Sequence, residues 1–266
     1  MNYKIQALNG FKMYFDQISN VFKTRYDAPE DFNLDQLATL TGLNRRKARL
    51  ILNFLSDLGL NQKFSLKKTV LGMVIYKNDE FFNDIGTLWF LHYLQSINSY
   101  MIIWNRTLNY LYEISEVSKG ELISIFSFLE GEISDYSFKE HIAKEVRIIL
   151  DAYSNQKYSK LNILEKVDDI YVVQRNIEIP DYILLAAIFL FKEIEFPGAT
   201  SLEVKDICYK DNSPGKIFIQ DEHVLRKKIE ELKKTGLISI ESRGDLDQVR
   251  FKEGISYIDV LEKYYK

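Results

Sequence analysis

The feature that most constrains this chain is a pair of short amphipathic segments joined by a glycine turn. Apolar residues recur at helical spacing from Leu34 to Leu40, and the turn Thr41-Gly42-Leu43 follows them. A second helix is predicted from Asn44 to Leu58, because Gly59 stands where a helix C-terminus favours glycine. Two helices joined by a tight glycine-containing turn are typical of a helix-turn-helix.

The second of these helices carries its charges on one side. At about 100° per residue, the apolar residues share one arc, which consists of Ala48, Ile51, Leu52, Leu55 and Leu58. The polar residues fall on the opposite side, and they are Arg45, Arg46, Arg49, Asn53 and Ser56. Arginine reads guanine or clamps a phosphate and asparagine can read adenine, so this side is a candidate nucleic-acid surface. The alternatives are a solvated face or a protein-binding face, although cations near a helix N-terminus oppose the macrodipole.

Further cations follow this helix. Lys63, Lys67 and Lys68 precede an apolar run from Val70 to Ile75. We interpret the segment 61–78 as a degenerate β-hairpin wing whose lysines lie near a phosphate backbone, with a further helix over part of it as the alternative. The predicted nucleic-acid-binding residues are therefore Asn44, Arg45, Arg46, Lys47, Arg49, Asn53, Lys63, Lys67 and Lys68.

The next hundred residues read as an aromatic-rich helical layer. Thr87 is a plausible helix cap, and Trp89 and Trp104 are better explained as packing anchors than as stacking platforms. Two more amphipathic helices are predicted at Lys119 to Gly131 and Phe138 to Tyr153. Near the end of this layer the residues from Ile170 to Val173 look like a strand.

A second recurring pattern begins at Pro180. Its predicted elements are an apolar helix Asp181 to Glu193, a short helix Ser201 to Cys208, a strand Lys216 to Ile219, a helix Asp221 to Thr235, and a hairpin pairing Leu237 to Ile240 with Gln248 to Lys252. This is the element order of a winged helix. The fourth element mixes cations with Glu222, Glu230 and Glu231, which is typical of a solvated face or a partner contact rather than a DNA reader.

We therefore predict a mostly α fold with small β-hairpin wings, in which winged-helix units stand at both ends of a helical middle. The expected boundaries are 1–78 for the N-terminal unit, 79–179 for the middle and 180–266 for the C-terminal unit.

Charge and cysteine content narrow the functional classes. The net charge is −3, whereas proteins that coat nucleic acid unspecifically are usually basic, so any DNA contact must be local. The single cysteine, Cys208, excludes an internal disulfide and fits a reducing cytoplasm. The sequence lacks an apolar run of about 18 residues and begins without the apolar region of a secretory signal, so we expect a cytoplasmic protein without membrane association.

Catalytic motifs are missing from the sequence. His92, His141 and His223 lie in different segments, without the paired spacing of a zinc site. The patterns GxxxxGK[ST], GxGxxG and HExxH do not occur. We expect no metal, no cofactor and no catalytic residue, and hence a non-enzymatic protein. An undetected enzyme such as a metal-dependent nuclease is the minor alternative.

Three stretches of the chain resemble an uncharacterised bacterial family. Thr87 to Leu111 resembles its helix signature Thr-Leu-Trp-x-Leu-His-aromatic with a following Trp and Asn, and Ser213 to Glu222 resembles its Ser-Pro-Gly-x-x-Phe stretch. Leu40 to Leu60 is similar to its helix-turn-helix segment, with a less glycine-rich turn. The resemblance implies a winged-helix-like protein encoded beside DNA phosphorothioation-type modification and phage-defence genes, next to enzymes of the phosphoadenosine-phosphosulfate reductase kind. It supplies no catalytic residues.

Two hypotheses follow. In the first, the protein is a DNA-binding subunit of a modification or phage-defence system and contacts double-stranded DNA through the helix 44–58. In the second, it is an adaptor that docks a modification or restriction enzyme without touching DNA, which the acidic overall balance favours.

Overall fold

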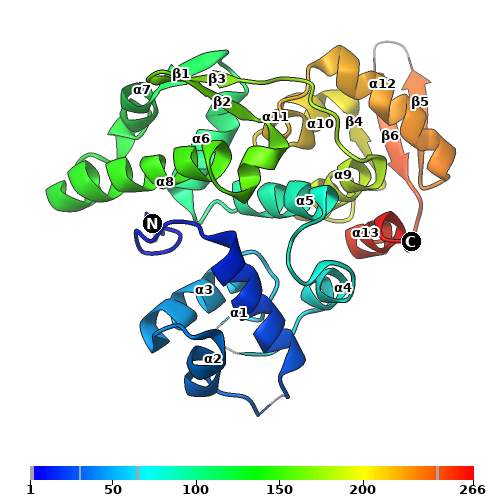
Figure 1. Cartoon of the computed structure of the whole chain (residues 1–266). Coiled ribbons are helices and arrows are strands. Elements are labelled where there is room, and N and C mark those ends of the chain that lie inside the picture. Colours follow the sequence, from blue (N-terminus) through cyan, green and yellow to red (C-terminus); the bar gives the residue numbers. More distant parts are fainter. Residues whose placement is uncertain (1–2, 30, 64–65, 244–245) are drawn as a thin grey trace.

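The computed structural model describes residues 3–29, 31–63, 66–243 and 246–266, which form a mostly helical protein with two small three-stranded antiparallel sheets. Figure 1 shows α1, α2 and α3 below a larger body, which contains both sheets and most of the remaining helices. A continuous cluster of buried apolar side chains runs from the N-terminal helices to the last helix.

Four helices form the N-terminal part, namely α1 (Phe15–Asp27), α2 (Leu34–Thr41), α3 (Arg45–Asp57) and α4 (Val70–Asp79). The Asn33 side chain caps α2 and the Asn44 side chain caps α3, which is why both helices begin there. Gly42 takes the left-handed conformation, φ 67°, and ends α2 in a tight turn. The predicted helix pair is therefore confirmed.

The predicted β-hairpin wing over 61–78 is wrong. Apart from one isolated bridge between Asn61 and Lys68, the described residues of this segment form no β-structure, and α4 begins at Val70. The Thr69 side chain accepts a hydrogen bond from the Gly72 N–H and so caps α4. Leu71 and Ile75 are buried one helical turn apart, which is the spacing of a helix that packs against the core on one side.

The middle of the chain combines helices with the first sheet. Its elements are α5 (Ile85–Ser96), α6 (Ile102–Leu111), β1 (Glu116–Ser118), α7 (Lys119–Ser124), η1 (Ser127–Leu129), the π-helix η2 (Ser137–Ile142), α8 (Ala143–Ser154), η3 (Lys157–Leu161), β2 (Leu164–Val167) and β3 (Ile170–Val173). The sheet has the order β1-β3-β2, so the predicted strand at 170–173 lies at its centre. Asp84, rather than Thr87, caps α5, because the buried Thr87 supplies the N–H that the Asp84 carboxylate accepts.

The C-terminal part is built around α9 (Asp181–Glu195), whose residues from Ile183 to Phe191 are all buried. Its other elements are β4 (Ser201–Glu203), α10 (Val204–Tyr209), α11 (Pro214–Ile217), α12 (Glu222–Leu232), η4 (Lys233–Thr235), β5 (Ile238–Arg243), β6 (Leu246–Phe251) and α13 (Tyr257–Tyr264). The second sheet has the order β4-β6-β5. Pairing of Ile240 with Val249 confirms the predicted hairpin, of whose turn residues 244–245 lie outside the described residues.

Two C-terminal predictions fail. The segment 216–219 is not a strand, because the Ser213 side chain caps a helical turn and Pro214 occupies its first position. The segment 201–208 begins as strand β4 and becomes helical only at Val204. Elsewhere Trp89 and Trp104 are buried and pack in the core as predicted. Among the described residues, no helix has the length and apolar character needed to cross a membrane.

Candidate nucleic-acid interface

The turn between α2 and α3 fixes where α3 begins and how it is oriented relative to α2. The Gly42 backbone takes positive φ without any atom within 4 Å of where a Cβ would stand, and the Leu43 N–H donates to the Ala38 carbonyl at 3.1 Å. The Asn44 Oδ1 then accepts from the Lys47 N–H at 2.9 Å. Asn44 is therefore committed to capping α3, which leaves its amide nitrogen, rather than its oxygen, for any ligand.

Arg46, Arg49 and Asn53 form what we call the open face of α3. They stand at positions i, i+3 and i+7, so they share one side of the helix, and all three are exposed. Within the described part of the chain none of the three side chains forms a hydrogen bond or an ion pair. No acidic residue lies in the first turn of α3, so both guanidinium groups are available to an external anion.

Arg45 lies on one flank of this open face and is already engaged. Its Nε lies 2.6 Å from Oδ1 of Asp35 on α2, and the two side chains are 59% and 70% exposed. An ion pair this exposed contributes little to stability and exchanges readily with another anion. Arg45 is consequently available to a phosphate only after it leaves Asp35.

Lys47 lies on the other flank. Its Nζ is 5.4 Å from the centre of the Phe11 ring and 5.7 Å from that of Tyr14, within the range of a cation–π contact. The rings hold the ammonium group beside the open face without neutralising its charge. Ser56, predicted on the polar side, is instead buried and donates to the Leu52 carbonyl, because the chain folds back over the end of α3.

The three lysines after α3 differ from one another. Lys68 donates from Nζ to the Tyr26 carbonyl at 2.8 Å, so it holds the loop against α1 and is not a free cation. Lys63 is exposed, with Nζ 5.9 Å from the centre of the Tyr100 ring. Lys67 is exposed, and its backbone carbonyl accepts from the Gln62 N–H at 3.0 Å, which closes the loop.

Several cations of α12 and of the adjoining η4 are paired within the protein, whereas Lys227 of α12 is exposed and forms no ion pair among the described residues. Arg226 pairs with Glu222 at 2.6 Å and with Asp247, and Lys233 pairs with Glu230 at 2.8 Å. Lys228 lies 3.8 Å from a carboxylate oxygen of Asp181. As the interspersed charges predicted, this helix offers a far less available set of cations than α3.

Two buried ionisable groups outside this surface, His92 and Cys208, have strongly shifted pKa values. His92 lies between the Tyr153 hydroxyl and the Ile217 carbonyl, and burial lowers its pKa to about 4, so it is neutral at pH 7. Burial raises the pKa of the Cys208 thiol to about 12, which makes it a poor nucleophile. In the described ranges no group of three or more His, Cys, Asp or Glu residues could hold a metal ion.

Comparison with known proteins shows a shared fold. Two crystal structures of SspB, one of them described as magnesium ion-bound, superpose with a TM-score of 0.74 each, at 14% and 15% identity. Both alignments cover 97% of this chain, and they cover 86% and 85% of the respective SspB chains. A search among curated proteins finds no match.

A family model covers most of the sequence. It matches residues 55–265, so it begins in the last turn of α3 and leaves the open face outside the match. The SspB alignments, in contrast, cover nearly the whole chain, including most of its N-terminal helices. Because the family model spans well over half of the sequence, the chain belongs to the DUF4007 family, which is described as a family of proteins of unknown function.

Proposed function

We propose that this protein is a non-enzymatic DNA-binding subunit of a bacterial DNA modification or phage-defence system and that it contacts double-stranded DNA through α3. The observation that carries the proposal is the open face, where Arg46, Arg49 and Asn53 stand together without partners among the residues that the structure describes. Cations gathered on one exposed helical edge of an acidic protein are best explained by a polyanionic ligand.

The chemistry of each group fits a role at a duplex. With α3 in the major groove, Arg46 and Arg49 would read guanine or clamp phosphates, and Asn53 would read adenine, at about 1–3 kcal/mol for a good bidentate contact. Lys47, Lys63 and Lys67 would approach neighbouring phosphates and add a salt-dependent contribution. Arg45 would join them by exchanging Asp35 for a phosphate, whereas Lys68 would contribute only through the loop it holds.

The C-terminal unit has a separate place in this proposal. We infer that residues 180–266 form a winged-helix unit, which is supported by the order α9, β4, α10 to α12, β5, β6 and by the sheet order β4-β6-β5. Because Arg226 and Lys228 of α12 and Lys233 of η4 are paired, this unit would contact protein rather than DNA. The resemblance of the segments 87–111 and 213–222 to a family encoded beside phosphorothioation-type genes supports the modification or defence setting.

The decisive experiment measures duplex binding of the variant Arg46→Ala/Arg49→Ala by fluorescence anisotropy over a range of salt concentrations. Loss of two phosphate contacts is expected to weaken binding at least tenfold and to make the slope of log K against log salt shallower by about 2. Arg147→Ala is the matched control, since Arg147 is exposed on α8 and forms no ion pair among the described residues. Unchanged affinity of the double variant would refute the role of α3.

The adaptor hypothesis is the second candidate, and the internal pairing of the α12 cations favours it for at least that part of the molecule. It predicts a stable complex with a modification or restriction protein and no duplex affinity even at low salt. The same duplex incubated with Mg²⁺ tests the remaining alternative: cleavage that a single carboxylate substitution abolishes would make the protein a metal-dependent nuclease.

A further inference from the structure

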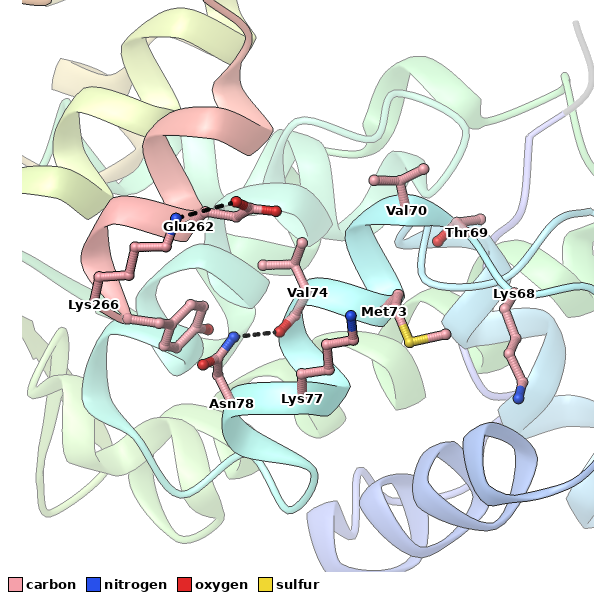
Figure 2. A pocket seen from close by; sticks show the side chains of 10 residues that line it. Lys68, Thr69, Val70, Met73, Val74, Lys77, Asn78, Glu262 and Lys266 are labelled. Carbon is pink, nitrogen blue, oxygen red and sulfur yellow. Dashed lines mark hydrogen bonds and ion pairs between the residues drawn. The ribbon is translucent and has the colours of Figure 1, made fainter.

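A groove of about 550 Å³ separates α4 from α13, two helices that are nearly 200 residues apart in sequence. Figure 2 shows Val70, Met73, Val74 and Lys77 on α4, with Glu262 and Lys266 on the facing side, while Lys68 points away from α13 toward α1. The groove shares none of the three residues of the open face of α3.

The lining of the groove combines apolar side chains of α4 with polar and charged ones. Val70 is 68% exposed although it occupies the first position of a helix whose other face is in the core. Met73 lies partly buried one turn further along, and Val74 is buried beneath it. The exposed Val70 and the partly exposed Met73 are the kind of surface that a partner's apolar side chains cover.

The charges around this lining are mainly positive. Lys77 is exposed and pairs with no carboxylate in the described part of the chain. Lys266 lies 3.6 Å from Glu262, but the two side chains are 75% and 46% exposed, so this pair is weak and exchangeable. The Lys68 Nζ is held against α1 by the Tyr26 carbonyl, so the positive charge of the groove comes from Lys77 and Lys266.

We propose that the groove between α4 and α13 is a docking site for an acidic amphipathic helix of a partner protein. An apolar floor with lysines along its length matches a helix that presents apolar residues at i, i+4 and i+7 and carboxylates beside them. DNA would satisfy the lysines but would leave Val70 and Met73 uncovered. Since α4 has 10 residues and is about 15 Å long, a partner helix of three turns would span it.

The test selects ligands from a random 16-residue peptide library displayed on phage, with the full chain as bait and the variant Val70→Glu/Lys77→Glu for counter-selection. Both positions are exposed, so the variant is expected to fold, and circular dichroism checks this. Enriched peptides are expected to carry apolar residues at helical spacing together with Asp or Glu. A synthetic peptide of this kind should bind the unaltered protein at least tenfold more tightly than either single variant.

Matched controls come from exposed residues elsewhere. Val167→Glu on β2 and Lys234→Glu beyond α12 should leave peptide affinity unchanged. Arg46→Ala/Arg49→Ala should also bind the peptide normally, which separates this inference from the proposed role of α3. Enriched peptides without an acidic amphipathic pattern, or with equal affinity for Val70→Glu/Lys77→Glu, would overturn the docking site. So would weakening by Lys77→Glu of binding to duplex DNA or to anionic lipid vesicles, because the groove would then serve that ligand.

Discussion

Burial shifts the pKa values of two side chains, Glu145 and His92, in opposite directions. Glu145 Oε1 accepts from the Trp104 indole N–H at 2.7 Å and from the Ala7 N–H at 2.9 Å, while Oε2 is buried without a hydrogen-bond partner in the described structure. Burial raises the pKa of Glu145 from 4.5 to about 7, whereas burial lowers that of His92 from 6.5 to about 4. The folded protein therefore prefers the neutral form of both groups.

These shifts predict an unusual dependence of stability on pH. Between pH 4.5 and 7 the folded state keeps the Glu145 proton that the unfolded chain releases, so this group lowers the free energy of unfolding as pH rises. Between pH 4 and 6.5 the unfolded chain binds a proton on His92 that the folded state does not bind. His92 therefore raises the free energy of unfolding as pH rises. Each slope is about 1.4 kcal/mol per pH unit, and the two offset each other between pH 4.5 and 6.5.

Glu145→Gln separates the two contributions. Glutamine imitates the protonated acid and keeps the oxygen that Trp104 and Ala7 use, so only the His92 contribution remains. Urea unfolding of this variant should show stability rising by about 2–3 kcal/mol from pH 4.5 to 6.5, where the unaltered protein changes little. Parallel profiles for the two proteins would mean that Glu145 is ionised in the folded state.

Asp35 is expected to restrain DNA binding. Its carboxylate holds Arg45 at 2.6 Å and places a negative charge beside the open face. Asp35→Asn should free Arg45 and remove that repulsion, so duplex affinity measured by anisotropy should rise by about threefold to tenfold, with a steeper salt dependence. Asp31→Asn, at an exposed position before α2, is the control. An affinity lower than that of the unaltered protein would show that the pair orients Arg45 for binding.

The sequence predicted which residues of α3 share a side, but not which of their cationic neighbours have partners elsewhere in the fold. Helical periodicity was sufficient to place Arg46, Arg49 and Asn53 on one exposed side. It could not indicate that Arg45 meets Asp35 or that Lys68 meets the Tyr26 carbonyl, because those contacts depend on how separate helices pack. Residue spacing shows which side chains share one face of a helix. Whether a cationic side chain is free to bind a ligand depends on the residues of other helices that pack beside it.

The same distinction holds for whole elements. The helices α2 and α3 were predicted closely because Asn33, Asn44 and Gly42 mark their ends with local capping chemistry. The segment 70–75 was misread as strand because a short apolar run fits a strand and a buried helix equally well. The last helix, α13, was not predicted, and its buried residues Val260 and Leu261 find their partners mainly on α9, distant in sequence.

Gly72 is a specific test of why α4 lies where it does. A Cβ at this position would stand 1.8 Å from the Tyr26 hydroxyl and 2.3 Å from the Leu60 carbonyl oxygen, so α4 approaches α1 closely only through a glycine. Gly72→Ala should reduce the free energy of unfolding in urea by about 1–3 kcal/mol, since the backbone oxygen cannot move aside alone.

Gly120 provides the control for this prediction. It lies in the helix α7, where the nearest atom to an added Cβ is 3.8 Å away, so Gly120→Ala should be neutral or stabilise by up to about 1 kcal/mol. Equal effects of the two substitutions would show that α4 can shift away from α1 without cost.

Several contacts join the middle and C-terminal parts of the molecule, and Asn212 supplies a cluster of them. Asn212 Oδ1 accepts from Asn105 Nδ2 at 2.7 Å and from Asn109 Nδ2 at 3.1 Å, and the Tyr93 hydroxyl donates to the Asn212 carbonyl at 3.0 Å. Asn212 itself has φ 67°, a conformation that asparagine tolerates better than most residues. We propose that the segments 1–78, 79–179 and 180–266 are structural units of one cooperative body, held together partly by this junction.

Asn212→Gly and Asn212→Ala test that proposal. Glycine keeps the backbone conformation but removes one acceptor from the amide groups of Asn105 and Asn109, which keep their bonds to the Ser96 and Asn105 carbonyls, at a cost of about 1–3 kcal/mol. Alanine adds strain of about 1 kcal/mol or more. Tryptophan fluorescence reports only the middle, because Trp89 and Trp104 both lie there, whereas far-ultraviolet circular dichroism reports all helices. If the body is cooperative, both probes should give coincident urea transitions in every variant, because loosening the junction destabilises all of its parts together. A dichroism transition that precedes the fluorescence transition in Asn212→Ala would instead show that residues 180–266 unfold as an independent domain.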